Sequence, residues 1–454
     1  SEFSLGIKLS GNANGEEKIK LTPVAGKIFD AFGNEMATSQ ALGETLLSKE
    51  KILNKGVLEF NSSQGRMASL AEVSPGIFLV HYSGPSDDGY LLTVKISSDG
   101  TVSKLTEIEN DTNYAWENGI MKMYEDVYVL AYRNNARNLM LQTIKVPTDG
   151  SSITKMKTIT ADNYTYSQIN FERVDHNTII LAYSGYRDDG FIKSFDVEAD
   201  GSISQGDSWE HDVERGKFHS LVKLAPGYFG LAYHGYRNHQ NAGNQWSSMV
   251  MTFSVDDEGK NFKGIATLKH DTETSSNAAN LDFIKIDEDS YALAYRTYNS
   301  SRWRAKIKTF TIKADGSSIV QESEQRVFIE SAGNGDEGYS MAWQKMDSDN
   351  LLLRLSDRSS DGFLRSYQVS NTGKTLTNDW YFEFEPNYTR YNTPYGLAKI
   401  DKDSYIVAYA DGSSDGYLKI FDIENMDTQK PKIVNSQLSA DNLTVLVELN
   451  EQTY

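Results

Sequence analysis

Short apolar runs recur along the chain, and each is followed by a polar turn and a second strand-like segment. Residues 180–201, ILAYSGYRDDGFIKSFDVEADG, are typical of this pattern, and residues 79–100 and 406–423 repeat it closely. The run before the turn is continuously apolar, which indicates a strand that is covered on both faces. Helical periodicity is nearly absent, so the pattern predicts an all-β protein.

A phrase close to Leu-Ala-Tyr marks each copy of the repeat. Its last position is occupied by Tyr82, Tyr132, Tyr183, Tyr233, Tyr295, Leu355 and Tyr409, of which Tyr82 and Leu355 belong to looser copies. Successive spacings are 50, 51, 50, 62, 60 and 54 residues, the period of four-stranded propeller blades. Asp-Gly pairs such as 99–100 and 200–201 supply the positive φ that a tight hairpin needs. The sequence therefore predicts a seven-bladed β-propeller of four-stranded blades.

The last copy lacks a convincing fourth strand, because Pro431 would interrupt its ladder. Upstream of the first copy lies an unpaired strand-like segment, KGVLEFN, residues 55–61. We expect residues 55–61 to complete the seventh blade, which would close the ring and remove its exposed strand edges. The propeller is then expected to span residues 51–430.

The two ends of the chain do not fit the repeat. The head, residues 1–50, contains a DAFGN turn after a short strand and a proline, and the tail, residues 431–454, contains an alternating strand after Asp441-Asn442. These ends resemble the closing and opening parts of the Ig-like modules strung through bacterial surface-layer proteins and adhesins. The seven repeats resemble propellers embedded in such proteins. The resemblance implies a fragment of an extracellular protein, on the bacterial cell surface or secreted, with neighbouring Ig-like modules; it transfers no catalytic residue.

The composition of the chain limits the classes of partner that we expect. Lys and Arg number 45 against 63 Asp and Glu, a net charge of -18, so we expect no nucleic-acid partner. No apolar run approaches the ~18 residues that span a bilayer, so we expect no membrane insertion by this fragment. The 454 residues include no cysteine, which excludes disulfides and thiol chemistry.

The sequence contains no close match to a known metal-binding motif. The stretches IDEDSY (Asp287, Asp289) and IDKDSY (Asp401, Asp403) lack the third ligand and the glycine of a calcium loop, and are interpreted as plain turns. With seven histidines and no cysteine, a zinc site is not expected. We therefore predict no cofactor, and calcium binding elsewhere stays open.

Two copies of the repeat lack the alanine of Leu-Ala-Tyr and have His81 and Arg354 at its position. The structural interpretation is a hydrogen-bonded polar residue that fills a gap between blades. The functional interpretation is that one or both side chains line the central channel.

Aromatic residues and arginines concentrate in two sets of loops. In a propeller, the loops between second and third strands and the loops between blades share one face. Such residues dominate recognition surfaces, and clustered arginines would suit an anionic ligand such as an acidic polysaccharide. An alternative is that they staple neighbouring blades together. The candidate ligand-binding residues are Tyr114, Trp116, Glu117, Arg133, Arg137, Tyr186, Arg187, Tyr236, Arg237, Tyr298, Arg302, Trp303, Tyr388 and Arg390.

These features predict a non-enzymatic binding or adhesion module that recognises a glycan or protein ligand through its loop face. One alternative is a glycoside hydrolase or polysaccharide lyase, with Glu117, Asp336 and Glu337 as candidate acids. A third hypothesis is a structural spacer without a ligand.

Overall fold

The computed structural model describes residues 18–21, 42–46, 51–165, 169–239, 243–272, 281–299, 302–327, 338–356, 361–370, 372–389, 393, 395–424, 433–438 and 445–449. The chain divides into a larger unit, Asn54–Asp422, and a smaller unit, Ser1–Leu53 with Ile423–Tyr454. In the smaller unit, two antiparallel pairs are described: β1 (Lys18–Leu21) with β2 (Leu42–Leu46), and β31 (Ile433–Leu438) with β32 (Val445–Leu449). No described helix has the length and apolar character that a membrane crossing requires.

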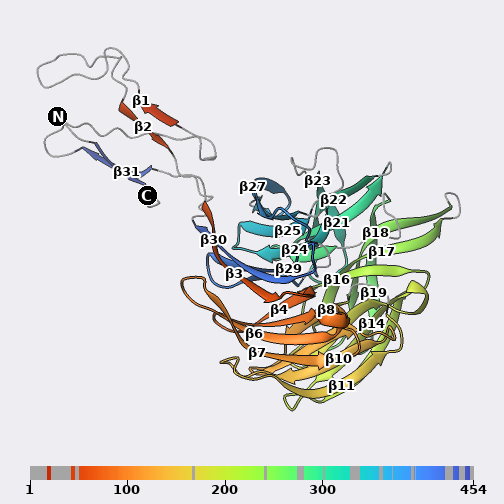
Figure 1. Cartoon of the computed structure of the whole chain (residues 1–454). Helices are drawn as coiled ribbons and strands as arrows, with labels where there is room; N and C mark the ends of the chain where they lie inside the picture. Colours follow the sequence, from red (N-terminus) through yellow and green to blue (C-terminus); the bar gives the residue numbers. More distant parts are fainter. Residues whose placement is uncertain are drawn as a thin grey trace, which may run out of the picture. The chain divides into compact units, whose positions relative to one another are not determined.

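The larger unit is a ring of seven four-stranded antiparallel sheets, so the predicted β-propeller is confirmed (Figure 1). Blade 1 consists of β4 (Arg66–Ser74), β5 (Ile77–Ser83), β6 (Gly89–Ile96) and β7 (Val102–Asp111). Blade 2 consists of β8 (Trp116–Lys122), β9 (Val127–Arg133), β10 (Leu139–Lys145) and β11 (Thr154–Asp162). Blade 3 consists of β12 (Asn170–Arg173), β13 (Thr178–Ser184), β14 (Gly190–Val197) and β15 (Ile203–Asp212). Blade 4 consists of β16 (Gly216–Ala225), β17 (Tyr228–His239), β18 (Gly243–Ser254) and β19 (Lys263–Asp271).

The remaining three blades follow the same order of strands. Blade 5 consists of β20 (Asp282–Lys285), β21 (Ser290–Asn299), β22 (Arg302–Ile312) and β23 (Ile319–Arg326). Blade 6 consists of β24 (Tyr339–Lys345), β25 (Asn350–Ser356), β26 (Gly362–Val369) and β27 (Leu376–Glu385). Blade 7 consists of β28 (Leu397–Lys399), β29 (Ser404–Ala410), β30 (Gly416–Glu424) and β3 (Lys51–Asn61). Two 3₁₀ turns, η1 (Pro85–Asp87) and η2 (Tyr186–Asp188), join second and third strands in blades 1 and 3.

The second strand of each blade is buried between its two neighbours. In β13 all seven residues are buried. Leu181 and Tyr183 pack against blade 2, including Ala131, whereas Ile180 and Ala182 pack against blade 4. This alternation explains the continuous apolar run in the sequence, because both faces of the strand are covered. Each blade therefore has no complete core of its own.

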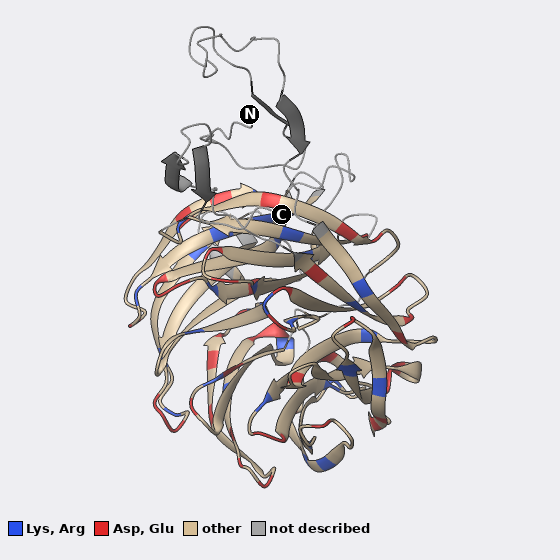
Figure 2. Ribbon diagram, turned by 90° about the vertical axis from the view of Figure 1, so that its left-hand side faces the viewer, with Lys and Arg blue, Asp and Glu red and all other residues tan. Residues whose placement is uncertain are grey.

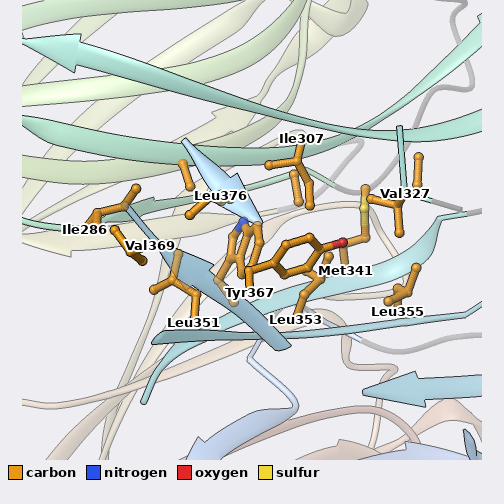
Figure 3. Packing of buried hydrophobic residues seen from close by; sticks show 14 of the residues in the cluster. Ile286, Ile307, Val327, Met341, Leu351, Leu353, Leu355, Tyr367, Val369 and Leu376 are labelled. Carbon is orange, nitrogen blue, oxygen red and sulfur yellow. The ribbon is translucent and has the colours of Figure 1, made fainter. Parts of the chain in front are cut away.

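The same packing recurs around the ring. Figure 3 shows it between blades 5 and 6, where Ile286 and Ile307 face Leu351, Leu353 and Leu355. Full burial of one such leucine or isoleucine contributes ~2 kcal/mol, so each interface contributes substantially to stability.

The repeated tyrosine also makes a polar link between blades. In four copies its hydroxyl donates to the carboxylate that ends the outer strand of the preceding blade, as Tyr132 does to Asp111 at 2.6 Å. Tyr295 donates to Asp271 at 2.8 Å and Tyr409 to Glu385 at 2.9 Å. Burial raises the pKa of Tyr132 and Tyr409, so their hydroxyls keep their protons and remain donors.

The outer strand of blade 7 comes from the other end of the chain. It is β3, which lies beside β30 and includes residues 55–61, the segment expected in this place. Lys55 Nζ forms an ion pair with Asp422 at 2.9 Å within blade 7. Asn61 Nδ2 donates to the Tyr82 hydroxyl of blade 1 at 3.3 Å. Residues at the end of β3 thus link blade 7 to blade 1.

Side chains of the inner strands satisfy backbone N–H groups of the next blade. The Asn170 side-chain oxygen accepts from Leu221 N at 2.8 Å, and the Ser220 hydroxyl accepts from Phe283 N at 3.0 Å. Asp282 accepts from Trp343 N at 2.7 Å. These bonds connect blades 3 to 6, because an inner strand has no further strand to pair with.

Blade 2 has Gly119 at the corresponding position, and Tyr395 replaces the missing side chain. A Cβ on Gly119 would lie 2.7 Å from the Phe171 ring and 3.1 Å from the Tyr395 ring. The Tyr395 ring stacks on Phe171 at 5.6 Å, and its hydroxyl accepts from Phe171 N at 3.4 Å. The main-chain oxygen of Tyr395 accepts from Leu70 N in blade 1. Tyr395 therefore connects blade 1 with blade 3.

The structure corrects the structural interpretation of His81 and Arg354. Both are completely buried, but neither has a hydrogen-bond partner in the described part of the chain. The Arg354 guanidinium occupies the space left by Gly396, whose Cβ would lie 2.5 Å from Nη1. Burial lowers the pKa of His81 to about 3 and that of Arg354 to about 9. Both residues therefore fill space between blades at an electrostatic cost.

Removing residues 1–61 is expected to abolish the single cooperative melting transition of the propeller. The deletion exposes the edge of β30 and removes the side chain that donates to Tyr82. Differential scanning calorimetry measures the effect, and deletion of residues 1–50 is the matched control because it keeps β3. An unchanged transition after removal of residues 1–61 would contradict the role of β3 in closing the ring.

Asp282→Asn is expected to stabilise the protein at neutral pH but not in acid. Burial raises the pKa of the Asp282 carboxyl to about 7, above that of an unfolded aspartate. The contribution of Asp282 to the free energy of unfolding is most favourable below pH ~4, where the carboxyl is protonated in both states. This contribution is lost as the pH rises toward ~7. Asparagine keeps an acceptor for Trp343 N and stays neutral. Urea unfolding should show a gain on the order of 2–4 kcal/mol at pH 8 and little change at pH 4.5; a gain independent of pH would refute the assignment.

Candidate ligand-binding face

Loops between second and third strands lie beside the loops that join consecutive blades. Ala115 N donates to Asp87 O at 2.8 Å, and Asn135 N donates to Asn113 O at 3.0 Å. Thr165 N donates to Arg137 O at 2.6 Å across the next pair of loops. We call this side of the propeller the junction face, and the side with the other two sets of turns the hairpin face.

Four predicted site residues lie together at the junction of blades 1 and 2. The rings of Tyr114 and Trp116 stack at 5.4 Å with an interplanar angle of 7°, and the Arg133 guanidinium lies 5.8 Å from the Tyr114 ring centre. Burial raises the pKa of the Glu117 carboxyl, and Arg133 opposes this effect. Glu117 has a φ of 57°, at a β-bulge where the register shifts between Trp116 and Gly119.

A second group joins blades 2 and 3. Arg137 Nη1 donates to the Tyr164 hydroxyl at 3.1 Å, and its guanidinium lies 5.9 Å from the Tyr164 ring centre. Tyr164 meets Tyr186 edge to face at 5.8 Å, and the Arg187 guanidinium lies 5.4 Å from the Tyr186 ring centre. Tyr186 is 64% exposed, so most of its surface is available to a ligand.

Blades 4 and 5 carry longer hairpins on this face. β17 and β18 have 12 residues each, whereas β13 of blade 3 has seven. The two longer hairpins place a tyrosine directly opposite a tryptophan at the same position. These pairs are Tyr236 with Trp246 at 5.1 Å and Tyr298 with Trp303 at 4.7 Å.

Several predicted residues are not brought together or lie outside the described residues. Tyr388 lies against Gly412 of blade 7, away from the groups in blades 2 to 5. The side chains of Arg237 and Arg302 lie outside the described part, as do Arg390, Asp336 and Glu337.

Three cations complete the groups, although none was among the predicted site residues. The guanidinium of Arg215 lies 5.2 Å from the Tyr236 ring centre, and that of Arg296 lies 4.1 Å from the Trp303 ring centre. Lys217 Nζ lies 5.7 Å from the Trp246 ring centre and pairs with Asp188 at 2.9 Å. The junction loop before blade 4 reads DVERGK and contains no aromatic residue, so sequence alone gave little reason to choose Arg215 or Lys217.

Carboxylates also occupy turns of the hairpin face. Figure 2 shows acidic and basic positions interspersed along the ribbon. Asp287 Oδ1 accepts from Ser290 N at 2.9 Å, and Asp401 Oδ1 accepts from Ser404 N at 2.9 Å. In both stretches the first aspartate thus caps a turn of the main chain. Asp175 caps its turn in the same way, accepting from Thr178 N at 2.8 Å.

Comparison with known proteins supports the fold alone. The sequence matches no protein-family profile and no curated protein. Among solved structures, the WD40 domain of Toxoplasma gondii coronin is 11% identical with a TM-score of 0.52, and the match covers 83% of this chain and 89% of that one. A candidate 6-phosphogluconolactonase of Bacteroides uniformis is 12% identical with a TM-score of 0.51, covering 86% and 96%. Sqt1 of Chaetomium thermophilum is 13% identical with a TM-score of 0.50, covering 83% and 99%. At these identities the chain is similar to them in fold only.

If the aromatic side chains hold neighbouring blades together, their removal should destabilise the protein. If they serve ligand recognition, their removal should leave its stability nearly unchanged. Tyr186→Ala is expected to change the free energy of unfolding by no more than ~0.5 kcal/mol, because this side chain is largely exposed. Trp246→Ala is expected to cost ~3–5 kcal/mol, because Trp246 is only 9% exposed. Chemical denaturation measures both. A cost above ~2 kcal/mol for Tyr186→Ala would show that Tyr186 is a staple between blades.

Proposed function

We propose that the propeller is a non-enzymatic binding module that recognises a glycan or protein ligand through its junction face. The observation that carries this proposal is the row of arginine–aromatic groups in blades 2 to 5. Two of its tyrosines, Tyr186 and Tyr298, are 64% and 39% exposed. Exposed aromatic rings held in place by neighbouring groups are typical of recognition surfaces, because little side-chain entropy is lost on binding.

A glycan is the favoured ligand class. The apolar faces of pyranose rings pack on aromatic rings, and guanidinium groups donate directed hydrogen bonds to sugar oxygens. An adhesion role on a bacterial surface follows from the resemblance of the repeats and of the chain ends, and it belongs to the same proposal.

The two alternatives have weaker support. A glycosidase needs two carboxylates on either side of the scissile bond, and the charged group that acts on the pKa of Glu117 is Arg133. Asp336 and Glu337 lie outside the described residues, so their distance from Glu117 carries no argument. A simple spacer would not need exposed tyrosines gathered on one face.

The test is a glycan array with the full chain, followed by an assay for released reducing sugar. The proposal expects binding without sugar release, and a loss of at least tenfold in affinity for Tyr186→Ala combined with Tyr298→Ala. The matched control is Tyr381→Ala, because Tyr381 is 44% exposed but belongs to the outer strand β27. Sugar release would favour the hydrolase or lyase, and unchanged affinity in the double variant would move the site elsewhere.

A further inference from the structure

Three neighbouring arginines of the junction face, Arg137, Arg187 and Arg215, share an unusual arrangement. All three are exposed, and each guanidinium lies within 6 Å of a tyrosine ring centre, at 5.9, 5.4 and 5.2 Å. The tyrosines are Tyr164, Tyr186 and Tyr236. A guanidinium on a ring face is held in orientation while its N–H edge still points outward, which suits bidentate pairing with an anion.

These three arginines form no ion pair with a carboxylate of the described residues, although the chain has 63 acidic residues. Two of the acids around them bind other groups. Asp188 pairs with Lys217, and Asp212 Oδ1 accepts from the backbone N–H groups of Glu214 and Arg215. The pKa of the Asp189 carboxyl is raised by burial and by Glu210, and Arg187 lowers it. The three arginines thus lie near acids but form no direct carboxylate pair in the described part of the chain.

The positive row occupies only part of the junction face. The backbone position of Arg187 is taken by Ser86 in blade 1 and Ser413 in blade 7. The position of Arg137 is taken by Asp87 in blade 1 and Ser414 in blade 7. Loops of blades 1 and 7 also carry acids such as Asp88, Asp411 and Asp415. Blade 3 carries Asp188 and Asp189 at the positions of Asp87 and Asp88 in blade 1. The arginines are therefore what distinguishes blades 2 to 4 as the place where an anionic chain would bind.

We propose that the ligand is an anionic polysaccharide, bound along blades 2 to 4 with its carboxylate or sulfate groups on Arg137, Arg187 and Arg215. This inference rests on the proposed function, because it names the ligand class of the same face. An arginine and a tyrosine recur together in each of these blades, and a polymer in which charged groups alternate with apolar sugar faces would contact both. An acidic protein offers the charges but no pyranose rings for the exposed Tyr186.

The experiment measures binding of the full chain to four immobilised probes by biolayer interferometry. The probes are polygalacturonate, dextran sulfate, neutral dextran and poly-glutamate, each at 50 to 300 mM NaCl, conditions chosen to vary screening. We expect one of the two anionic polysaccharides to bind at least tenfold more tightly than dextran and poly-glutamate. Polygalacturonate and dextran sulfate distinguish carboxylate from sulfate as the recognised group.

The variant that tests the arginines combines Arg137→Gln, Arg187→Gln and Arg215→Gln. We expect it to lose at least tenfold in affinity for the anionic polysaccharide, together with most of the salt dependence. The matched control combines Lys95→Gln, Lys313→Gln and Lys402→Gln, which removes the same charge from exposed positions near turns of the hairpin face. This control is expected to keep both the affinity and the salt dependence.

The remaining outcomes separate this inference from the proposed function. One such outcome is that dextran binds as tightly as the anionic polysaccharides, with an affinity that the arginine variant keeps and the Tyr186→Ala and Tyr298→Ala variant loses. That result would refute the proposal of an anionic ligand but would keep the junction face as the binding site. If poly-glutamate were the only probe that bound, the proposed ligand class would be an acidic protein and not a polysaccharide. If the double tyrosine variant left every probe and every array ligand unaffected, both proposals would fail.

Discussion

Burial of each second strand between two neighbouring sheets is the constraint on which this propeller depends. A blade alone would expose both faces of a strand such as β13, in which all seven residues are buried. In four copies the tyrosine of Leu-Ala-Tyr adds a hydrogen bond to the preceding blade, as Tyr183 does to Asp162 at 2.5 Å. Stability therefore belongs to interfaces rather than to blades, and a missing outer strand in one blade affects the whole ring.

This constraint also determines where the junction face receives its aromatic residues. In blades 3, 4 and 5 the repeated tyrosine is followed three residues later by Tyr186, Tyr236 and Tyr298. Because the strand is fixed by its core residues, the residue three positions on comes to the junction face, on the long hairpins of blades 4 and 5 and in the turn η2 of blade 3. The ligand-binding candidates thus vary on a scaffold whose geometry is held by a separate set of side chains.

The sequence predicted features that repeat, and it missed those that occur once. Leu-Ala-Tyr, the Asp-Gly turns and the seven spacings made the propeller predictable, since each copy supports the others. Tyr395 was not predictable, because it reaches Phe171, more than 200 residues earlier, to compensate for one glycine. Arg215 was missed for a related reason, since its partner Tyr236 lies on β17, the second strand after its loop, and the loop itself contains no aromatic residue. His81 and Arg354 broke the repeat visibly, yet sequence could not show that they would lack hydrogen-bond partners.

A net charge of -18 is compatible with a face that attracts anions, because screening separates the two faces. A seven-residue strand such as β13 spans ~23 Å. The Debye length at physiological ionic strength is only ~8 Å. A ligand at the junction face therefore responds mainly to charges within that distance, such as Arg137 and Arg187, and only weakly to the acidic turns of the hairpin face. In the proposed binding mode, the negative body would disfavour polyanions elsewhere, and the local arginines would supply direct contacts in one region. The distribution of charge would then contribute specificity as well as affinity.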